Sequence, residues 1–212
     1  MSHRRLALTA GALAVTTLAT VSSVSTASAA TAPTGTSSLA SVLLADGDTF
    51  DRDWSDYDVV TQAVLAVLDA KPGSPVAVLT DGTVPLTAFL PDDRAFRILA
   101  ADVTGHWDRD EAAVFATVAS LGIDTVEAVL LYHVVPGATI DSAAALGSDG
   151  AALRTASGGT VEVDVLSRRV VRLQDADPSD RDPFLARRQL DLNAGNVQIA
   201  HGLTAVLRPV DL

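Results

Sequence analysis

Two runs of closely spaced aspartates are the first residues that could do chemistry, because Ca²⁺ is bound by carboxylate and other oxygen ligands. The first run lies between residues 46 and 58, and the second lies between residues 175 and 182. Neither run has both the glycine and the glutamate that an EF-hand loop requires at its sixth and twelfth positions. We therefore interpret both runs as solvated acidic loops and assign no metal ligand, with a calcium site of another kind as the alternative. The runs consist of Asp46, Asp48, Asp51, Asp53, Asp56 and Asp58, and of Asp175, Asp177, Asp180 and Asp182.

Three histidines beyond the N-terminal region are the next candidates, since imidazole is a common zinc ligand and a common general base. They are His106, His133 and His201. The chain has no H-E-x-x-H motif, and no two of the three lie within helical reach of each other. We interpret two of them as buried structural residues and one as a surface residue, and we expect His106, beside Trp107, to lie in a loop.

Enzymatic chemistry has little support in the sequence. The motifs G-x-S-x-G and S-x-x-K of serine hydrolases are absent, and so is cysteine. The only glutamates are Glu111, Glu127 and Glu162, and the first two each follow an aspartate by three residues, which explains them as parts of helix caps. We therefore predict a protein that is not an enzyme and has no cofactor. A secreted hydrolase with an unrecognised site is the third hypothesis for the function, after two in which the protein is not an enzyme.

Charge and targeting signals limit the function further. The 212 residues carry 15 Lys+Arg against 26 Asp+Glu, a formal charge of −11, which argues against binding to nucleic acid or to an anionic membrane surface. Arg4 and Arg5 precede an apolar stretch that is followed by Ala27-Ser28-Ala29, the pattern of a secretory signal peptide. We expect residues 1–29 to be removed from a secreted protein, with an uncleaved anchor as the alternative. The rest of the chain has no apolar run long enough to span a membrane.

The remaining chain must supply the elements that position these residues. We expect a disordered leader over residues 30–42, where Ala, Ser, Thr and Pro dominate. Apolar residues recur with helical spacing from Tyr57 to Lys71, and Asp108 with Glu111 forms a capping box that opens a helix ending at Gly122. The runs 75–79 and 83–90 predict a hairpin, and short β-type runs follow residue 151. Helices in the first half and strands in the second indicate an α+β fold.

Three segments carry a resemblance to a known family. Residues 86–96 combine an apolar strand with a proline, an acidic pair and Ala-Phe. Residues 130–137 read Leu-Leu-Tyr-His-Val-Val-Pro-Gly, and residues 196–209 run from an asparagine through a histidine to a closing proline. In this order the segments resemble the signatures of fasciclin domains. The positions that carry the resemblance are Phe89, Pro91, Asp92, Phe96, Tyr132, His133, Asn196, His201 and Pro209.

The resemblance implies an α+β, fasciclin-like fold over residues 43–210, in which a helical first half packs against a wedge or sandwich of antiparallel strands. It also implies a secreted, non-enzymatic protein that adheres to a cell surface or an extracellular matrix, through a partner protein or polysaccharide. Partner binding would fall near Tyr132 and His133, for which packing is the alternative because their neighbours are apolar. A carrier of a small apolar or cofactor ligand is the second hypothesis for the protein, and the oligomeric state stays open.

Overall fold

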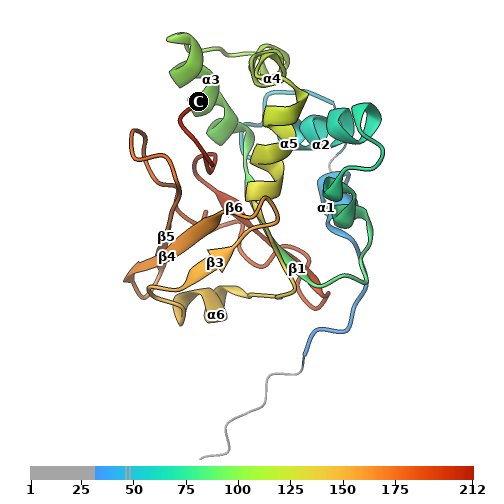
Figure 1. The fold of residues 1–212 in the computed structure, drawn as a ribbon, viewed down its shortest axis with the longest axis vertical. Coiled ribbons are helices and arrows are strands. Elements are labelled where there is room, and N and C mark those ends of the chain that lie inside the picture. The colour runs from blue at the N-terminus through green and yellow to red at the C-terminus, as the bar shows by residue number, and fades with distance from the viewer. Residues whose placement is uncertain (1–31, 46, 48) are drawn as a thin grey trace, which may run out of the picture. The chain divides into compact units, whose positions relative to one another are not determined.

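Strand β1 (Leu86–Pro91) lies at the centre of the fold, and all its residues are buried (Figure 1). It pairs antiparallel with β2 (Val134–Pro136) and parallel with β6 (Gln198–Leu203), which gives a three-stranded sheet in the order β2-β1-β6. An unbroken apolar run suits such a strand, because both of its faces are covered. The three segments that resemble fasciclin domains therefore meet as neighbouring strands of one sheet.

The structure is a computed structural model, and it describes residues 32–45, 47 and 49–212. Residues Ala32–Leu212 form one compact unit. The expected signal peptide, residues 1–29, and the aspartates Asp46 and Asp48 lie outside the described residues. In the described part of the chain, no single helix is long and apolar enough to cross a bilayer. Two consecutive helices pass that test only when taken together, and they are bent by 103°.

A second sheet has three antiparallel strands in sequence order. They are β3 (Ala152–Arg154), β4 (Thr160–Ser167) and β5 (Val170–Gln174). In β4 the side chain of Val161 is buried while the next residue, Glu162, is exposed, as the alternation in the sequence predicts. Phe184 forms a single bridge to β5 and Leu185 forms one to β6, so the segment after β5 links the two sheets.

The helices lie mainly in the first half of the chain. They are α1 (Leu39–Leu43), α2 (Asp58–Ala70), the 3₁₀ helix η1 (Pro75–Thr80), α3 (Asp93–Thr104), α4 (Glu111–Ser120), α5 (Ile123–Tyr132) and α6 (Ser142–Leu146). Within this unit, α2 to α5 gather at one end, and the second sheet with α6 lies at the other (Figure 1). The predicted helices appear as α2 and α4, and the expected α+β fold is confirmed. The parallel pairing of β1 with β6 was not predicted, because the alternation of apolar and polar residues along a strand does not identify the strand with which it pairs.

Two clusters of buried side chains correspond to the helical part and the strand part. Leu86, Ala88 and Leu90 of β1 belong to the cluster formed with the helices, whereas Phe89 belongs to the cluster between the two sheets. This division follows from the two-residue period of a strand, which sends successive side chains to opposite faces. Strand β1 thus packs against both parts of the protein.

The segment ahead of α2 differs from the disordered leader expected over residues 30–42. Gly35 forms a parallel bridge with Asn196, and the buried Leu39 donates its N–H to Gln198 Oε1 at 2.8 Å. The physical reason is the four-residue spacing of Leu39 and Leu43, which puts both side chains on one helical face that fills the core. The polar composition around these two leucines concealed this pattern.

Residues 75–79 are a second difference, because they form the 3₁₀ helix η1 and no hairpin strand. Ser74 caps the start of η1 with its side chain, which accepts from the N–H of Val76 at 3.2 Å, and Pro75 takes the first helical position. Both are start signals for a helix. A short apolar run alone does not distinguish a strand from a buried helical turn.

Candidate functional site

Tyr132 and His133, the expected partner-binding pair, lie where α5 leads into β2, and both are buried at 1% and 5% exposure. The Tyr132 hydroxyl donates to the carbonyl of Thr160 at 2.7 Å. His133 contacts two elements, because its Nδ1 lies 2.7 Å from the carbonyl of Val129 and its Nε2 accepts from the N–H of Leu207 at 2.9 Å. Each side chain therefore joins its helix to a later part of the chain.

The hydrogen bonds of His133 fix its protonation. Since Nε2 accepts from Leu207, the proton of the neutral ring is on Nδ1, which donates to Val129. Burial lowers the pKa of His133 to about 4, although the bond to Val129 acts in the opposite direction. The neutral ring and the buried tyrosine agree with packing roles, and partner binding by this pair stays a prediction.

The first signature segment forms the junction between β1 and α3. Phe89 and Phe96 are buried in the two separate clusters, and Pro91 is the last residue of β1. The Asp92 side chain accepts from the N–H of Ala95 at 2.9 Å, which caps the start of α3. These four residues therefore set the direction in which the chain leaves the central sheet.

The closing signature segment holds loops on both sides of β6. Asn196 accepts from the N–H of Ser37 at 2.9 Å through Oδ1. His201 is completely buried, and its Nε2 lies 2.8 Å from the carbonyl of Ile140, in the loop before α6. Pro209 is half-buried in the segment after β6. The polar members of this segment are thus hydrogen-bonded within the fold.

Gln198 has a similar structural role that the sequence analysis missed. It is completely buried, its Oε1 accepts from Leu39, and its Nε2 donates to the carbonyls of Val78 and Asp81, both at 2.8 Å. One amide therefore connects β6 to α1 and to the end of η1. The available signal was a glutamine inside a strand pattern, since a buried amide must find partners in the fold.

The second aspartate run surrounds Arg208, whose side chain is only 4% exposed. Ion pairs join Arg208 to Asp102 of α3 at 2.7 Å, to Asp180 at 2.8 Å and to Asp177 at 3.6 Å. The expectation of a solvated loop therefore fails here, because Asp177 and Asp180 are paired with an internal cation. The run was recognisable in the sequence, but its partner lies about thirty residues further along the chain.

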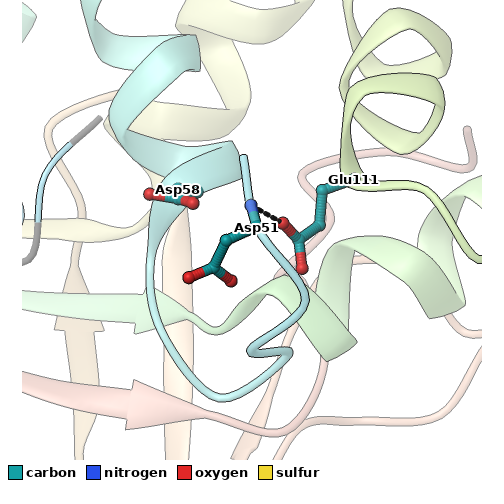
Figure 2. Close-up of side chains that lie close together, drawn as sticks. All are labelled: Asp51, Asp58 and Glu111. Atoms are coloured by element: carbon teal, nitrogen blue, oxygen red, sulfur yellow. Dashed lines mark hydrogen bonds between the residues drawn. The ribbon is translucent and has the colours of Figure 1, made fainter. Parts of the chain in front are cut away.

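The first aspartate run meets acidic residues from α3 and α4. Asp51, Asp58 and Glu111 each offer one carboxylate oxygen, and these oxygens lie within 4.8 Å of one another (Figure 2). Asp58 also belongs to a second such group, with Asp56 and Asp93. Glu111 and Asp93 are completely buried, whereas Asp51 is exposed. Such a set of carboxylates is typical of the ligands of a hard divalent cation.

Local hydrogen bonds position these carboxylates. Asp93 Oδ1 accepts from the N–H of Val59 at the start of α2, at 2.9 Å, and Glu111 Oε2 accepts from the N–H of Asp51 at 2.7 Å. Burial, a hydrogen bond with Asp56 and repulsion from Asp56 and Glu111 raise the pKa of Asp93 to about 8. Burial and repulsion from the neighbouring aspartates also raise the pKa of Glu111. The site therefore gathers carboxyl groups whose charged forms are disfavoured by burial and by mutual repulsion.

Glu111 was assigned to a capping box with Asp108, and this assignment is wrong. Asp110 caps α4 instead, because its side chain accepts from the N–H of Ala112 at 3.0 Å. Glu111 is the first residue of α4 and its side chain is buried beside Asp51. Two adjacent acidic residues at a helix start were the available signal, since one cap leaves the other side chain free for another role.

A hollow of about 240 Å³ gathers arginines on this acidic protein. Arg168 and Arg169 line it from the turn between β4 and β5, and Arg187 lines it from the segment after β5. Val171 and Leu185 contribute apolar surface to the same hollow. The three arginines are exposed, and they form no ion pair with any of the residues that the structure describes.

A larger cleft, of about 620 Å³, lies between α3 and the end of the chain. Its apolar lining includes Ile98, Leu99 and Phe184. The paired side chains of Asp102 and Arg208 also line this cleft. The cleft therefore combines apolar surface with several charged side chains, among them Asp180, Arg181 and Asp182.

Comparisons with known proteins identify the family of the chain. The chain is similar to the solved structure of a FAS1 domain pair from the insect cell adhesion molecule Fasciclin I, with 13% sequence identity and a TM-score of 0.49. The alignment covers 74% of this chain and 48% of that chain, so this chain spans about half the length of the domain pair. No curated protein matches it. A family model for the fasciclin domain matches residues 61–183, more than half of the sequence, and the chain therefore belongs to the fasciclin domain family.

Proposed function

We propose that this protein is secreted and that it adheres, without catalysis, to an anionic polysaccharide of a cell surface or extracellular matrix. The observation that carries the proposal is the hollow lined by Arg168, Arg169 and Arg187. The fasciclin domain and the signal-peptide pattern of residues 1–29 support an extracellular setting. The fasciclin domain would comprise residues 43–210, together with the described residues 32–42 that pack against them.

The chemistry of arginine favours this class of partner. A guanidinium group offers a planar fork of donors that binds the two oxygens of a carboxylate or phosphate at once. The whole chain has a formal charge of −11, so most of its surface repels a polyanion. Binding is therefore confined to this hollow, and it weakens as salt screens the attraction.

A binding assay with the purified protein on immobilised acidic and neutral polysaccharides tests the proposal. We expect saturable binding to a polymer of uronic acids, weaker at ~0.5 M than at ~0.05 M salt, and none to a neutral glucan. The variant Arg168→Gln/Arg169→Gln/Arg187→Gln should bind more than ~100-fold more weakly, because each hydrogen bond to a charged group contributes about 1.5–3 kcal/mol.

The matched control removes the same charge elsewhere, in the variant Arg94→Gln/Arg109→Gln/Arg154→Gln. All three of these side chains are exposed and lie outside the hollow. Equal loss of binding in both variants would contradict the proposal, because net charge alone would then explain it. Loss in a folded Tyr132→Phe/His133→Gln variant, with the hollow intact, would move the site to that pair.

A carrier of a small apolar or cofactor ligand is the second candidate. The cleft of about 620 Å³ beside α3 favours it, since apolar residues such as Ile98, Leu99 and Phe184 share its lining with charged side chains. A folded protein that binds no surface polymer, but carries a co-purified small molecule detected by native mass spectrometry, would favour the carrier over the adhesion protein.

A further inference from the structure

Asp51, Asp58 and Glu111 bring three carboxylates from separate elements to one place. Asp51 lies in the loop before α2, Asp58 is the first residue of α2, and Glu111 is the first residue of α4. Figure 2 shows their carboxyl groups around one small space, and one oxygen of each lies within 4.8 Å of the others. Ca²⁺–oxygen bonds are about 2.3–2.6 Å long, so two oxygens on one ion are at most ~5 Å apart. The spacing therefore fits a single ion.

Glu111 supplies an independent observation that points to a ligand. Its side chain is completely buried, and only one of its oxygens, Oε2, is used by the N–H of Asp51. The other oxygen, Oε1, is buried and has no hydrogen-bond partner among the described residues. An unpaired buried carboxylate oxygen is unfavourable, because folding removes the water that solvated it. A cation in this space would give Oε1 a partner.

The second aspartate run, residues 175–182, has a buried basic partner for its carboxylates. Asp177 and Asp180 pair with the buried guanidinium of Arg208. In the part of the chain that the structure describes, no basic side chain forms an ion pair with Asp51 or Glu111. The protein thus compensates the aspartates around Arg208 with its own cation, whereas Asp51 and Glu111 have room for a cation from solution.

We propose that Asp51, Asp58 and Glu111 bind one Ca²⁺ ion. Calcium fits because every donor is an oxygen, and because this ion accepts irregular geometry and completes its shell with carbonyls and water. Asp51 is exposed, which gives the ion a path from solvent. The neighbouring Asp93 already uses its Oδ1 to accept from the N–H of Val59 at the start of α2. A bound ion would fasten the loop before α2 to α2 and α4.

Thermal unfolding of the purified protein, stripped with a chelator and then titrated with CaCl₂, tests the site. For a Kd of ~0.1–1 mM, as in extracellular calcium modules, ~10 mM calcium should raise the Tm by ~3–8 °C. The variant Glu111→Gln keeps the shape of the side chain but removes its charge, so the calcium shift should disappear. Without calcium this variant should melt at or above the wild-type temperature, because one buried negative charge is gone.

Glu162→Gln is the matched control, since it removes the same charge from an exposed position of β4 and should keep the full calcium shift. If Glu111→Gln does not fold, Asp51→Asn at the exposed edge of the site replaces it. No Tm shift at ~10 mM calcium, or the same shift in the Glu111 variant as in wild type, would overturn the proposal. An equal shift with MgCl₂ would overturn the choice of calcium.

Discussion

The ring of His133 titrates differently in the folded and the unfolded chain. The ordinary pKa of histidine is 6.5, and burial lowers the pKa of His133 to about 4 in the fold. As the pH falls from 6.5 towards 4, only the unfolded chain gains this proton, so the fold loses up to ~3 kcal/mol of unfolding free energy. Above pH 6.5 both states are neutral at this residue, and its contribution is fully retained.

We therefore expect His133→Gln to flatten the pH dependence of stability between pH 6.5 and 4. The slope of unfolding free energy against pH should decrease by up to the amount that corresponds to the uptake of one proton on unfolding, because glutamine does not titrate. Urea unfolding at several pH values measures it, and the difference between variant and wild type cancels the carboxylates that titrate in both. His106→Gln is the matched substitution of a histidine by glutamine at an exposed position. Identical slopes for wild type and His133→Gln would show that the ring is not neutral in the fold.

The segment ahead of α1 depends on close backbone contact with the turn after η1. A Cβ atom on Gly82 would lie 1.9 Å from the carbonyl oxygen of Thr36 and 2.8 Å from the N–H nitrogen of Ser38. Only glycine therefore lets residues 36–38 lie against this turn. The contact explains how a polar, Ser- and Thr-rich stretch becomes part of the ordered domain.

Gly82→Ala should release this segment. We expect a loss of ~1–3 kcal/mol in unfolding free energy, the usual effect of forcing a methyl group into a packed site, and faster proteolysis within residues 32–38. Gly73→Ala is the control, because no atom lies within 4 Å of a Cβ at that position. Limited proteolysis followed by mass spectrometry locates the cuts. Equal cutting rates in the two variants would show that the segment is not held at Gly82.

The sequence predicted the long helices because their apolar spacing is strong over several turns, as in α2. It failed where the evidence was short or non-local. Residues 75–79 were too few to separate a strand from a 3₁₀ helix, and the parallel pairing of β1 with β6 joins residues more than a hundred positions apart. The three signature segments were recognised from their residues, but only the structure shows that they form one sheet.

The candidate cation site was predictable only in part. The aspartates from Asp51 to Asp58 were evident as a cluster, because they are close in the chain. Glu111 was not joined to them, since tertiary packing brings α4 to this place and a local pattern explained Glu111 as part of a cap. The burial of Glu111, with no ion pair to any basic side chain that the structure describes, is a property of the fold that no short motif records.

Arg208 connects parts of the protein that are far apart in the chain. Its guanidinium pairs with Asp102 at the C-terminal end of α3 and with Asp177 and Asp180 in the loop after β5. Its backbone N–H also donates to Asp175 Oδ2 at 2.8 Å. The helical part and the strand part are therefore joined by one buried cation as well as by β1.

Replacing Arg208 should thus weaken the whole fold. We expect Arg208→Leu to lose ~3–5 kcal/mol of unfolding free energy, because removal of one partner leaves buried carboxylates unpaired. Arg208→Lys should recover only part of this loss, since one ammonium group lacks the planar fork that reaches several carboxylates. Arg188→Leu is the control, at an exposed arginine with no ion pair among the described residues. Urea unfolding followed by circular dichroism measures all three variants. A loss below ~1 kcal/mol in Arg208→Leu would mean that the aspartates around it take up protons or water, and that Arg208 does not hold the two parts together.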